Sequence, residues 1–180
     1  MTLPNMNLSQ IKSESIGPGA YIMQIKRVEI DTKYNRLVCE ADICEGDLAG
    51  YYERLNERAK FWGMKISLYM DEKSLWKFRK TIDVLAESNP DFDWDYDGEN
   101  DEQKLVGKRL GVVTRLKEYM GNDGQKKSKI VPYSTISIND VLTKNYTIPE
   151  PLRLDDSEFS GEVVDTTSGF GPVKDDEIPF

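Results

Sequence analysis

Carboxylates alternate with aromatic rings in the stretch DFDWDYDGENDE, residues 91–102, and this spacing raises the question of metal binding. The first half of an EF-hand calcium loop has its oxygen ligands and glycine at the same spacing. The matching residues are Asp93, Asp95, Asp97 and Gly98. The twelfth position of such a loop supplies a bidentate glutamate, whereas this chain has Lys104 there. We therefore expect a solvated acidic loop that binds no metal or cofactor and docks its aromatic rings on the protein body.

The chain contains no histidine, which removes most side-chain catalysis near neutral pH. Ser-His-Asp and Cys-His nucleophile systems are excluded, and Cys39 and Cys44 cannot complete the usual four-ligand zinc site. Both thiols are expected to be free and buried. A metal-dependent nuclease would need acidic residues converging from separate elements, and the pattern identifies none. The sequence therefore predicts a protein that is not an enzyme, with carboxylate-only catalysis as a distant alternative.

Charge is distributed unevenly along the 180 residues, whose net charge is −8. Residues 151–180 hold eight acidic and two basic residues, and residues 91–102 hold seven acidic and no basic residues. The remaining chain has 22 basic and 17 acidic residues, a net charge of +5. A mildly basic body with an acidic tail is typical of proteins that handle nucleic acid.

Cations and aromatic rings recur on the strand faces that we expect to point outward. Single-stranded nucleic acid is bound by cations that contact phosphates and by rings that stack on bases, at roughly 1–3 kcal/mol per base. The candidates are Tyr34, Arg36, Trp62, Lys65, Tyr69, Arg115, Lys117, Tyr119, Lys126, Lys127 and Lys129. The alternative is that about half of these rings belong to the core and about half of these charges only solvate a face.

Alternating apolar residues predict five strands that would position these side chains. They are expected over residues 20–30, 36–43, 64–70, 106–120 and 129–137. In the first strand the apolar positions change parity after Ile25, which predicts a bulge. The second strand should bury Leu37, Cys39, Ala41 and Ile43 and expose Arg36, Glu40 and Asp42. Pro132 in the last strand predicts an edge position or a bulge.

Two helices complete the pattern. The first is expected within residues 47–61, and the second over residues 72–88, capped by Asp71 and stopped by Asn89-Pro90. With the first helix as an insertion, the order is strand, strand, strand, helix, strand, strand, which is that of the OB-fold. The predicted fold class is mainly β with helical insertions: a five-stranded OB-fold barrel, a helix between its third and fourth strands, and a disordered acidic tail.

The predicted organisation is a lead-in over residues 1–18, an OB-fold domain over residues 19–148 and a disordered tail over residues 149–180. Neither a secretory signal nor an apolar run long enough to cross a membrane is visible. These features favour a soluble cytoplasmic protein with no membrane partner.

The last six residues, DDEIPF, resemble the C-terminal tip of bacterial single-stranded DNA-binding proteins, typically Asp-Asp-Asp-Ile-Pro-Phe. The residues concerned are Asp175, Asp176, Glu177, Ile178, Pro179 and Phe180. Five of them match, and the sixth, a glutamate, keeps the charge. In that family the tip docks on replication, repair and recombination enzymes, with the phenylalanine ring in an apolar pocket and its carboxylate against a basic residue. The resemblance implies that these six residues bind such partners.

The body lacks the first strand and the Gly/Gln-rich linker of the bacterial proteins. Its segments GAYIMQIKRVE, EGDLAGYYERLNERAKFWG and ESNPDFDWD are similar to those of phage-encoded proteins found among replication and recombination genes, several of which are taken to bind single-stranded DNA. The resemblance implies non-sequence-specific binding of single-stranded DNA in the cytoplasm of a bacterial host, with homo-oligomers possible and the bacterial tetramer geometry not transferable. The alternative is an interaction adaptor of a phage replication complex that binds no DNA.

Overall fold

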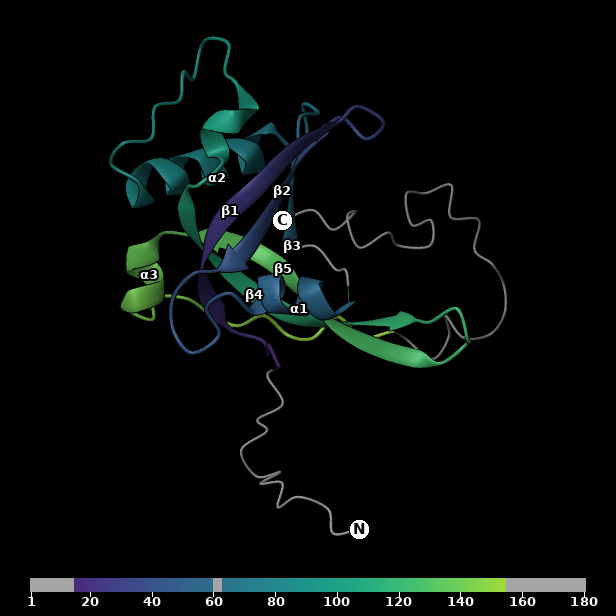
Figure 1. The fold of residues 1–180 in the computed structure, drawn as a ribbon. Helices are drawn as coiled ribbons and strands as arrows, with labels where there is room; N and C mark the ends of the chain where they lie inside the picture. Colours follow the sequence, from purple (N-terminus) through teal and green to yellow (C-terminus); the bar gives the residue numbers. More distant parts are fainter. Residues whose placement is uncertain (1–14, 60–62, 155–180) are drawn as a thin grey trace, which may run out of the picture.

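A computed structural model describes residues 15–59 and 63–154, which form a five-stranded antiparallel sheet with short helices around it (Figure 1). The strands are β1 (Ala20–Asp31), β2 (Arg36–Ile43), β3 (Met64–Tyr69), β4 (Arg109–Met120) and β5 (Lys126–Ile136). The helices are α1 (Tyr51–Ala59), α2 (Leu75–Ser88), the 3-10 helix η2 (Glu102–Leu105) and α3 (Ile138–Leu142). The predictions of a mainly β fold and of five strands are confirmed.

The strands follow the order β3-β2-β1-β4-β5, so β1 is central and β3 and β5 lie at the edges. β1 pairs with β4 through residues 20–24 and with β2 through residues 23–31. The register with β2 shifts between Ile25 and Arg27, which confirms the predicted bulge and leaves Lys26 as the extra residue. The two edge strands approach within 8 Å between Cα atoms, but no hydrogen-bonded ladder joins them in the described part of the chain.

The apolar face of the sheet forms one core with α2. On β2 the side chains of Leu37, Cys39, Ala41 and Ile43 are buried, as the alternation predicted. Ile82 and Leu85 of α2 close the core from the other side. Burial raises the pKa of Cys39 to about 12, so this free thiol is protonated and packs as an apolar group. Cys44 is also free but only half-buried.

The second face of β2 is buried too, and here the expectation of solvent exposure is wrong. Arg36 is 2% exposed, Glu40 6% and Asp42 4%. Each charge is covered by a different group: Arg36 by the hairpin tip, Glu40 by an ion pair with Arg27 at 2.9 Å, and Asp42 by α1. A buried charge requires such partners because its desolvation is costly.

Asp42 positions α1 by accepting backbone hydrogen bonds. Its carboxylate receives the N–H groups of Tyr52 at 2.8 Å and Glu53 at 3.0 Å, both in the first turn, and that of Ile43 at 2.8 Å. The first N–H groups of a helix have no partner within the helix, and their positive dipole end favours a carboxylate. α1 is therefore attached to β2 by a charged cap supplied from the sheet.

α2 begins later than the sequence indicated. Its first residue is Leu75, preceded by the cap position Ser74, whereas the expected cap Asp71 accepts the Ser74 hydroxyl at 3.1 Å inside a preceding turn. The expected stop is confirmed, because Asn89 ends the helix and its side chain donates to the carbonyl oxygens of Leu85 and Arg109.

The acidic loop docks on the body through its rings. Phe92 and Trp94 pack against the core with centroids 6.0 Å apart, and Tyr96 donates to Asp83 of α2 at 2.8 Å. This agrees with the expected docking, although Tyr96 is 47% exposed.

β5 starts three residues earlier than expected and is an edge strand with a bulge opposite Val113 and Thr114 of β4. Pro132 pairs with Thr114 directly after the shift, so the predicted edge position and the predicted bulge are both confirmed.

The sequence did not predict α3 or η2. No helix in the described ranges is long and apolar enough to cross a membrane.

Part of the expected tail lies along the sheet. The N–H of Leu152 donates to Leu116 at 2.9 Å and its carbonyl oxygen accepts from Glu118 at 2.8 Å, which forms a parallel bridge with β4. Arg153 lies 3.8 Å from the Glu118 carboxylate. The expectation of disorder from residue 149 is therefore wrong for residues 149–154, and the rest of the tail lies outside the described residues.

The cap from Asp42 yields a stability prediction. Asp42→Ala should lower the free energy of unfolding by about 2–3 kcal/mol, because three backbone N–H groups lose a charged acceptor. Urea unfolding followed by circular dichroism measures the change. Asp47→Ala removes an exposed carboxylate near the same helix and should change stability by less than about 0.5 kcal/mol. Equal losses in the two variants would contradict the assigned role of Asp42.

Candidate nucleic-acid interface

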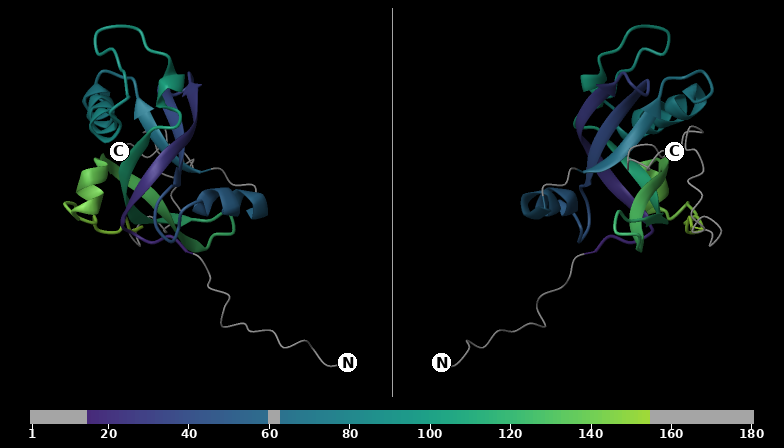
Figure 2. Two further views of the ribbon diagram at one scale, coloured as in Figure 1. Left: turned by 60° about the vertical axis from the view of Figure 1, so that its left-hand side comes forward. Right: turned by 90° about the vertical axis from the view of Figure 1, so that its right-hand side faces the viewer.

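Two hairpin tips carry most of the predicted binding residues. The β1–β2 tip and the β4–β5 tip both project to the right in Figure 1, the first above and the second below. Figure 2, in its right-hand panel, turns this side of the molecule toward the viewer. The first tip is tight because Asn35 adopts a φ of 49°, a left-handed conformation that asparagine tolerates well. The turn of the second tip has Gly124 at a φ of 73°.

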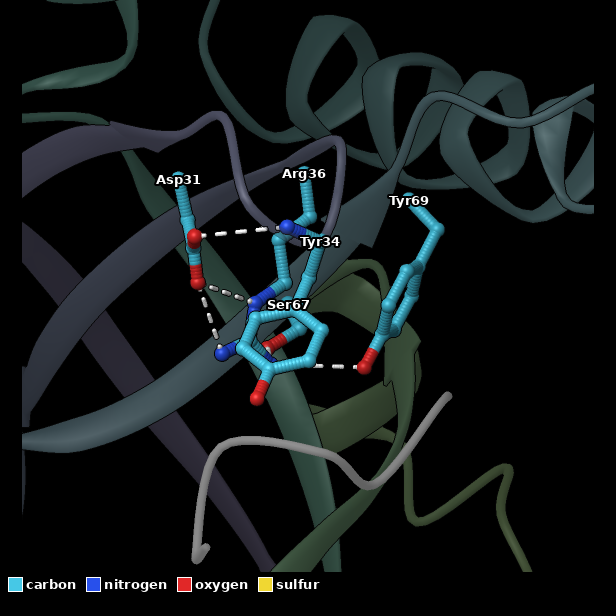
Figure 3. A network of polar contacts seen from close by, with 5 residues as sticks. All are labelled: Asp31, Tyr34, Arg36, Ser67 and Tyr69. Atoms are coloured by element: carbon cyan, nitrogen blue, oxygen red, sulfur yellow. Dashed lines mark hydrogen bonds and ion pairs between the residues drawn. The ribbon is translucent and has the colours of Figure 1, made fainter. Parts of the chain in front are cut away.

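Arg36 is the centre of a polar network at the base of the first tip (Figure 3). Its Nε and Nη2 donate to Asp31 Oδ2 at 3.1 and 3.0 Å. Its Nη1 donates to the hydroxyl oxygens of Ser67 and Tyr69 at 3.2 and 3.3 Å. The guanidinium also lies 5.0 Å from the ring centroid of Tyr34 and 5.7 Å from that of Tyr69.

These contacts perturb both members of the ion pair. Burial acts to raise the pKa of Asp31, but hydrogen bonds from Arg36 and from the Tyr34 N–H outweigh it and hold this pKa below its usual value. Burial acts to lower the pKa of Arg36, but its hydrogen bonds to Tyr69 and Asp31 keep this pKa above the usual range. The pair is therefore ionised near neutral pH.

The network gives Arg36 a role different from the predicted phosphate contact. A side chain that is 2% exposed presents almost no surface to a ligand. Its contacts instead fix the half-buried rings of Tyr34 and Tyr69 around one cation. The Nζ of Lys33, which is exposed, lies 4.8 Å from the ring centroid of Tyr34. The first tip thus presents two positioned rings and a surface cation.

The second tip combines cations with carboxylates. Lys126 is paired with Glu118 at 2.9 Å, and Lys127 with Asp123 at 3.1 Å. Lys129 Nζ lies 5.1 Å from the ring centroid of Tyr119. Lys126, Lys127, Glu118 and Tyr119 line a shallow hollow of about 540 Å³ together with Ser128. Lys126 and Lys127 are exposed and Lys129 is half-buried, and the first two would have to exchange a carboxylate for a phosphate in order to bind nucleic acid.

The remaining predicted residues lie on the strands between and beside the tips. Lys65 is half-buried on β3 opposite Glu40. Arg115 is half-buried on β4 and stacks over Tyr133 at 5.0 Å. Lys117 is 8% exposed, against the expected outward orientation, because residues 149–154 cover this part of β4. Burial, and secondly the charge of Arg115, lower the pKa of Lys117.

The structure brings some of the predicted binding residues together, leaves others undescribed, and shows exposed rings that were not predicted. The structure brings together Tyr34, Arg36 and Tyr69 at one tip and Tyr119, Lys126, Lys127 and Lys129 at the other. Trp62 and the six tip residues 175–180 lie outside the described residues. Two exposed rings were missed: Trp76, which is 63% exposed, and Tyr133, which is 42% exposed. The sequence could have indicated an exposed ring at Trp76, because this residue lies outside the apolar stripe of its helix.

This arrangement suits binding better than catalysis. Rings fixed beside cations can stack on bases while the cations contact phosphates. Among residues 15–59 and 63–154, no three Cys, Asp or Glu side chains are arranged to hold a metal ion, and this includes the calcium-like spacing in residues 93–98.

No family model matches the chain, and no curated protein is significantly similar to it.

The Arg36 network yields the second prediction. Arg36→Ala should lower the free energy of unfolding by about 2–3 kcal/mol, slightly less than for a fully buried pair because Asp31 is 27% exposed. Arg36→Lys keeps the charge but not the forked donors, and should cost about 1–2 kcal/mol. Urea unfolding measures both changes. The matched control is Lys33→Ala, which removes an exposed cation beside the same ring and should change stability by less than about 0.5 kcal/mol. A loss as large as that of Arg36→Ala would argue against a special role for the buried cation.

Proposed function

We propose that this chain is a non-sequence-specific single-stranded DNA-binding protein that acts in phage DNA replication and recombination. Its acidic C-terminal tip would recruit replication and recombination enzymes of the bacterial host or of the phage. The body would bind exposed strands through the two hairpin tips and the strands between them. It carries out no catalysis in this role.

The strand order supports an OB-fold. An OB barrel places its first strand between the second and the fourth, and closes or nearly closes between the third and the fifth. The order β3-β2-β1-β4-β5 and the approach of β3 to β5 agree with such a barrel. OB-folds bind oligonucleotides on the face of strands two and three and with the loops between strands one and two and between strands four and five. These two loops correspond to the two hairpin tips.

The observation that carries the proposal is the repeated pairing of a tyrosine ring with a cation. Lys33 lies over the ring of Tyr34, Lys129 over that of Tyr119, and Arg115 over that of Tyr133. Such a pair places a flat ring beside a cation, which suits a ligand that is both flat and anionic. Unstacked bases on a phosphate backbone have both properties, whereas duplex DNA hides the faces of its bases.

A second candidate is the adaptor that binds no DNA. The observation favouring it is the pairing of Arg36, Lys126 and Lys127 with carboxylates of the same chain, which reduces the attraction for phosphate. The pair of Lys127 with Asp123 is about half exposed on both sides, and such pairs are weak, at about 0–1 kcal/mol, so a phosphate can replace the carboxylate there. Glu118 is also held by Arg153, so it does not depend on Lys126 alone. We therefore rank the adaptor second.

A titration with oligothymidylate separates the two candidates. The single-stranded DNA-binding role predicts saturable quenching of tryptophan fluorescence and a steep loss of affinity as salt rises. Replacing Lys126 and Lys127 by glutamate should weaken binding and reduce the slope of log affinity against log salt by about 1.4, since each phosphate contact contributes about 0.7. Lys144→Glu changes a residue that follows directly after α3, the helix drawn on the side away from the two tips in Figure 1, and should leave the slope unchanged. No association at about 50 mM salt would favour the adaptor.

The acidic tail supplies a further prediction. Residues 149–154 lie along β4, and the Leu154 N–H donates to the Glu118 carboxylate that pairs with Lys126, so the described chain ends beside the second tip. Removing residues 155–180 should therefore strengthen binding to oligothymidylate at low salt and have little effect at high salt, because screening already weakens competition there. Fluorescence anisotropy of a labelled oligonucleotide measures both affinities. Deletion of Pro179 and Phe180 alone is the control, since it keeps the negative charges and should leave affinity nearly unchanged. Weaker binding after the full truncation would contradict competition by the tail.

A further inference from the structure

A groove between α2 and the β4–β5 sheet lies outside the set of predicted binding residues, apart from Arg115. It has a volume of about 400 Å³, at the lower end of the range of roughly 300–1,000 Å³ for small-ligand sites. Two exposed rings line it, Trp76 from α2 and Tyr133 from β5. Its other lining residues are Lys77, Lys80, Thr81, Arg115, Ser134 and Thr135.

All the charged residues that line this groove are cations. Three of its lining residues are cations and none is acidic, although the whole chain has a net charge of −8. The hollow at the second hairpin tip, in contrast, contains Glu118, and the one beside α1 contains Glu40, Asp42 and Glu53. Lys77 lies over Trp76 at 5.5 Å and Arg115 over Tyr133 at 5.0 Å, so each ring has a cation on one face.

One polar atom in the groove lacks a partner. The Nε of Arg115 is buried and has no hydrogen-bond acceptor among the described residues. A buried donor without an acceptor is costly, and in native structures it calls for an explanation such as a bound water, ion or ligand. A guanidinium recognises phosphate well, so an anionic oxygen bound in the groove could accept from Arg115.

The groove is preformed. The hydroxyl oxygens of Thr81 on α2 and Thr135 on β5 lie 3.0 Å apart, and both side chains are 3% exposed. A second link joins the end of α2 to the chain after β5, where the Ile138 N–H donates to Ser88 Oγ at 3.1 Å. These hydrogen bonds fix the helix against the strand, so the two walls that carry the rings are positioned without a ligand. Preorganisation of this kind lowers the entropic cost of binding.

From this combination we propose that the α2–β5 groove is a nucleotide subsite for single-stranded DNA. One unpaired base stacks on Trp76 or Tyr133, and its flanking phosphate lies against Lys77, Lys80 and Arg115. This inference rests on the proposed function and adds a site for the strand on α2, beyond the two hairpin tips. The volume suits one nucleotide better than a duplex, whose bases are stacked and whose width exceeds a groove between one helix and one strand.

An acidic peptide is the alternative occupant of a cationic groove. The rings argue for a base, because both are amphipathic and remain largely exposed, and a flat partner covers such a ring best by stacking. An apolar side chain would instead need a closed pocket, and the lining here is mainly charged and hydroxylic. We therefore assign the groove to a nucleotide and treat the peptide as an outcome of the test.

The experiment isolates the fluorescence of Trp76. The chain has three tryptophans, and the full-length variant Trp62→Phe/Trp94→Phe keeps only Trp76. Oligothymidylate of about 16 nucleotides, the upper end of the site size of an OB-fold, should quench this fluorescence in parallel with the anisotropy of a labelled strand. The variant Trp62→Phe/Trp76→Phe keeps only Trp94, which packs against Phe92 and Phe78, and its fluorescence should change little. A hairpin duplex should not quench Trp76.

Substitutions in the otherwise native chain give an independent measurement. Trp76→Ala should weaken binding about 5- to 150-fold, the factor that corresponds to loss of one stacked base at about 1–3 kcal/mol. Lys77→Glu/Lys80→Glu should weaken binding and lower its salt dependence, whereas Lys144→Glu should do neither. Tyr133→Phe should bind nearly as the native chain does. Circular dichroism checks that each variant is folded.

The outcomes separate this inference from the proposed function. Normal association by anisotropy, with Trp76 unquenched and with native affinity in Trp76→Ala, would overturn the subsite and leave the proposed function standing. Absence of association in the native chain would overturn both. Quenching of Trp76 by a peptide with the sequence of residues 172–180, but not by oligothymidylate, would assign the groove to a protein segment and overturn the nucleotide subsite. Equal quenching by duplex would overturn the preference for an unpaired base.

Discussion

The bulge at Lys26 is the constraint on which the arrangement of the sheet depends. β1 must pair with β4 through its first half and with β2 along its second half, while one set of its side chains stays in the core. The extra residue changes the parity, so Ile25 and Val28 are both buried although they are three residues apart. It also exposes Lys26 and turns Arg27 toward Glu40 on the opposite face. Without this shift the second half of β1 would present polar residues to the core.

The sequence contained most of this information for the strands, because a half-buried strand repeats every two residues. The parity change in β1, the inner face of β2 and the irregularity at Pro132 were all readable in this way. The burial of the outer face of β2 could not be predicted in this way. Arg36, Glu40 and Asp42 have the spacing of solvent-exposed residues, and what buries them comes from β1, the hairpin tip and α1. Alternation reports which residues share a face, but not what covers that face.

The candidate site was predictable in composition and only partly in geometry. Rings and cations could be placed on outer faces, but their partners could not, since ion pairs such as that of Lys126 with Glu118 depend on strand register. The same limit hid the α2–β5 groove, whose residues come from segments separated by about fifty positions in the chain. The start of α2 was misplaced because Asp71 and Ser74 both have side chains suited to capping, and the chain makes a turn before the helix begins.

Buried charged residues stabilise the fold of this protein, whereas charged residues at the surface are available to exchange partners. Arg36 and Asp42 are satisfied internally and fix parts of the fold, the first by holding two rings and the second by holding a helix. The lysines of the second tip and of α2 stay at the surface, where exchange of partners is cheap. This division lets the surface charges be replaced or neutralised without loss of the sheet.

The position of β5 at the edge of the sheet has a consequence for solubility. An edge strand offers unpaired backbone groups to which a strand from another molecule can add, and long, flat edges of this kind promote aggregation. β5 carries Lys126, Lys127 and Lys129 near its start, followed by Pro132 and a bulge. Charge opposes the approach of a second copy, the proline removes a backbone donor, and the bulge interrupts the regular spacing. The residues that make this strand a candidate surface for DNA therefore also oppose self-association through its edge.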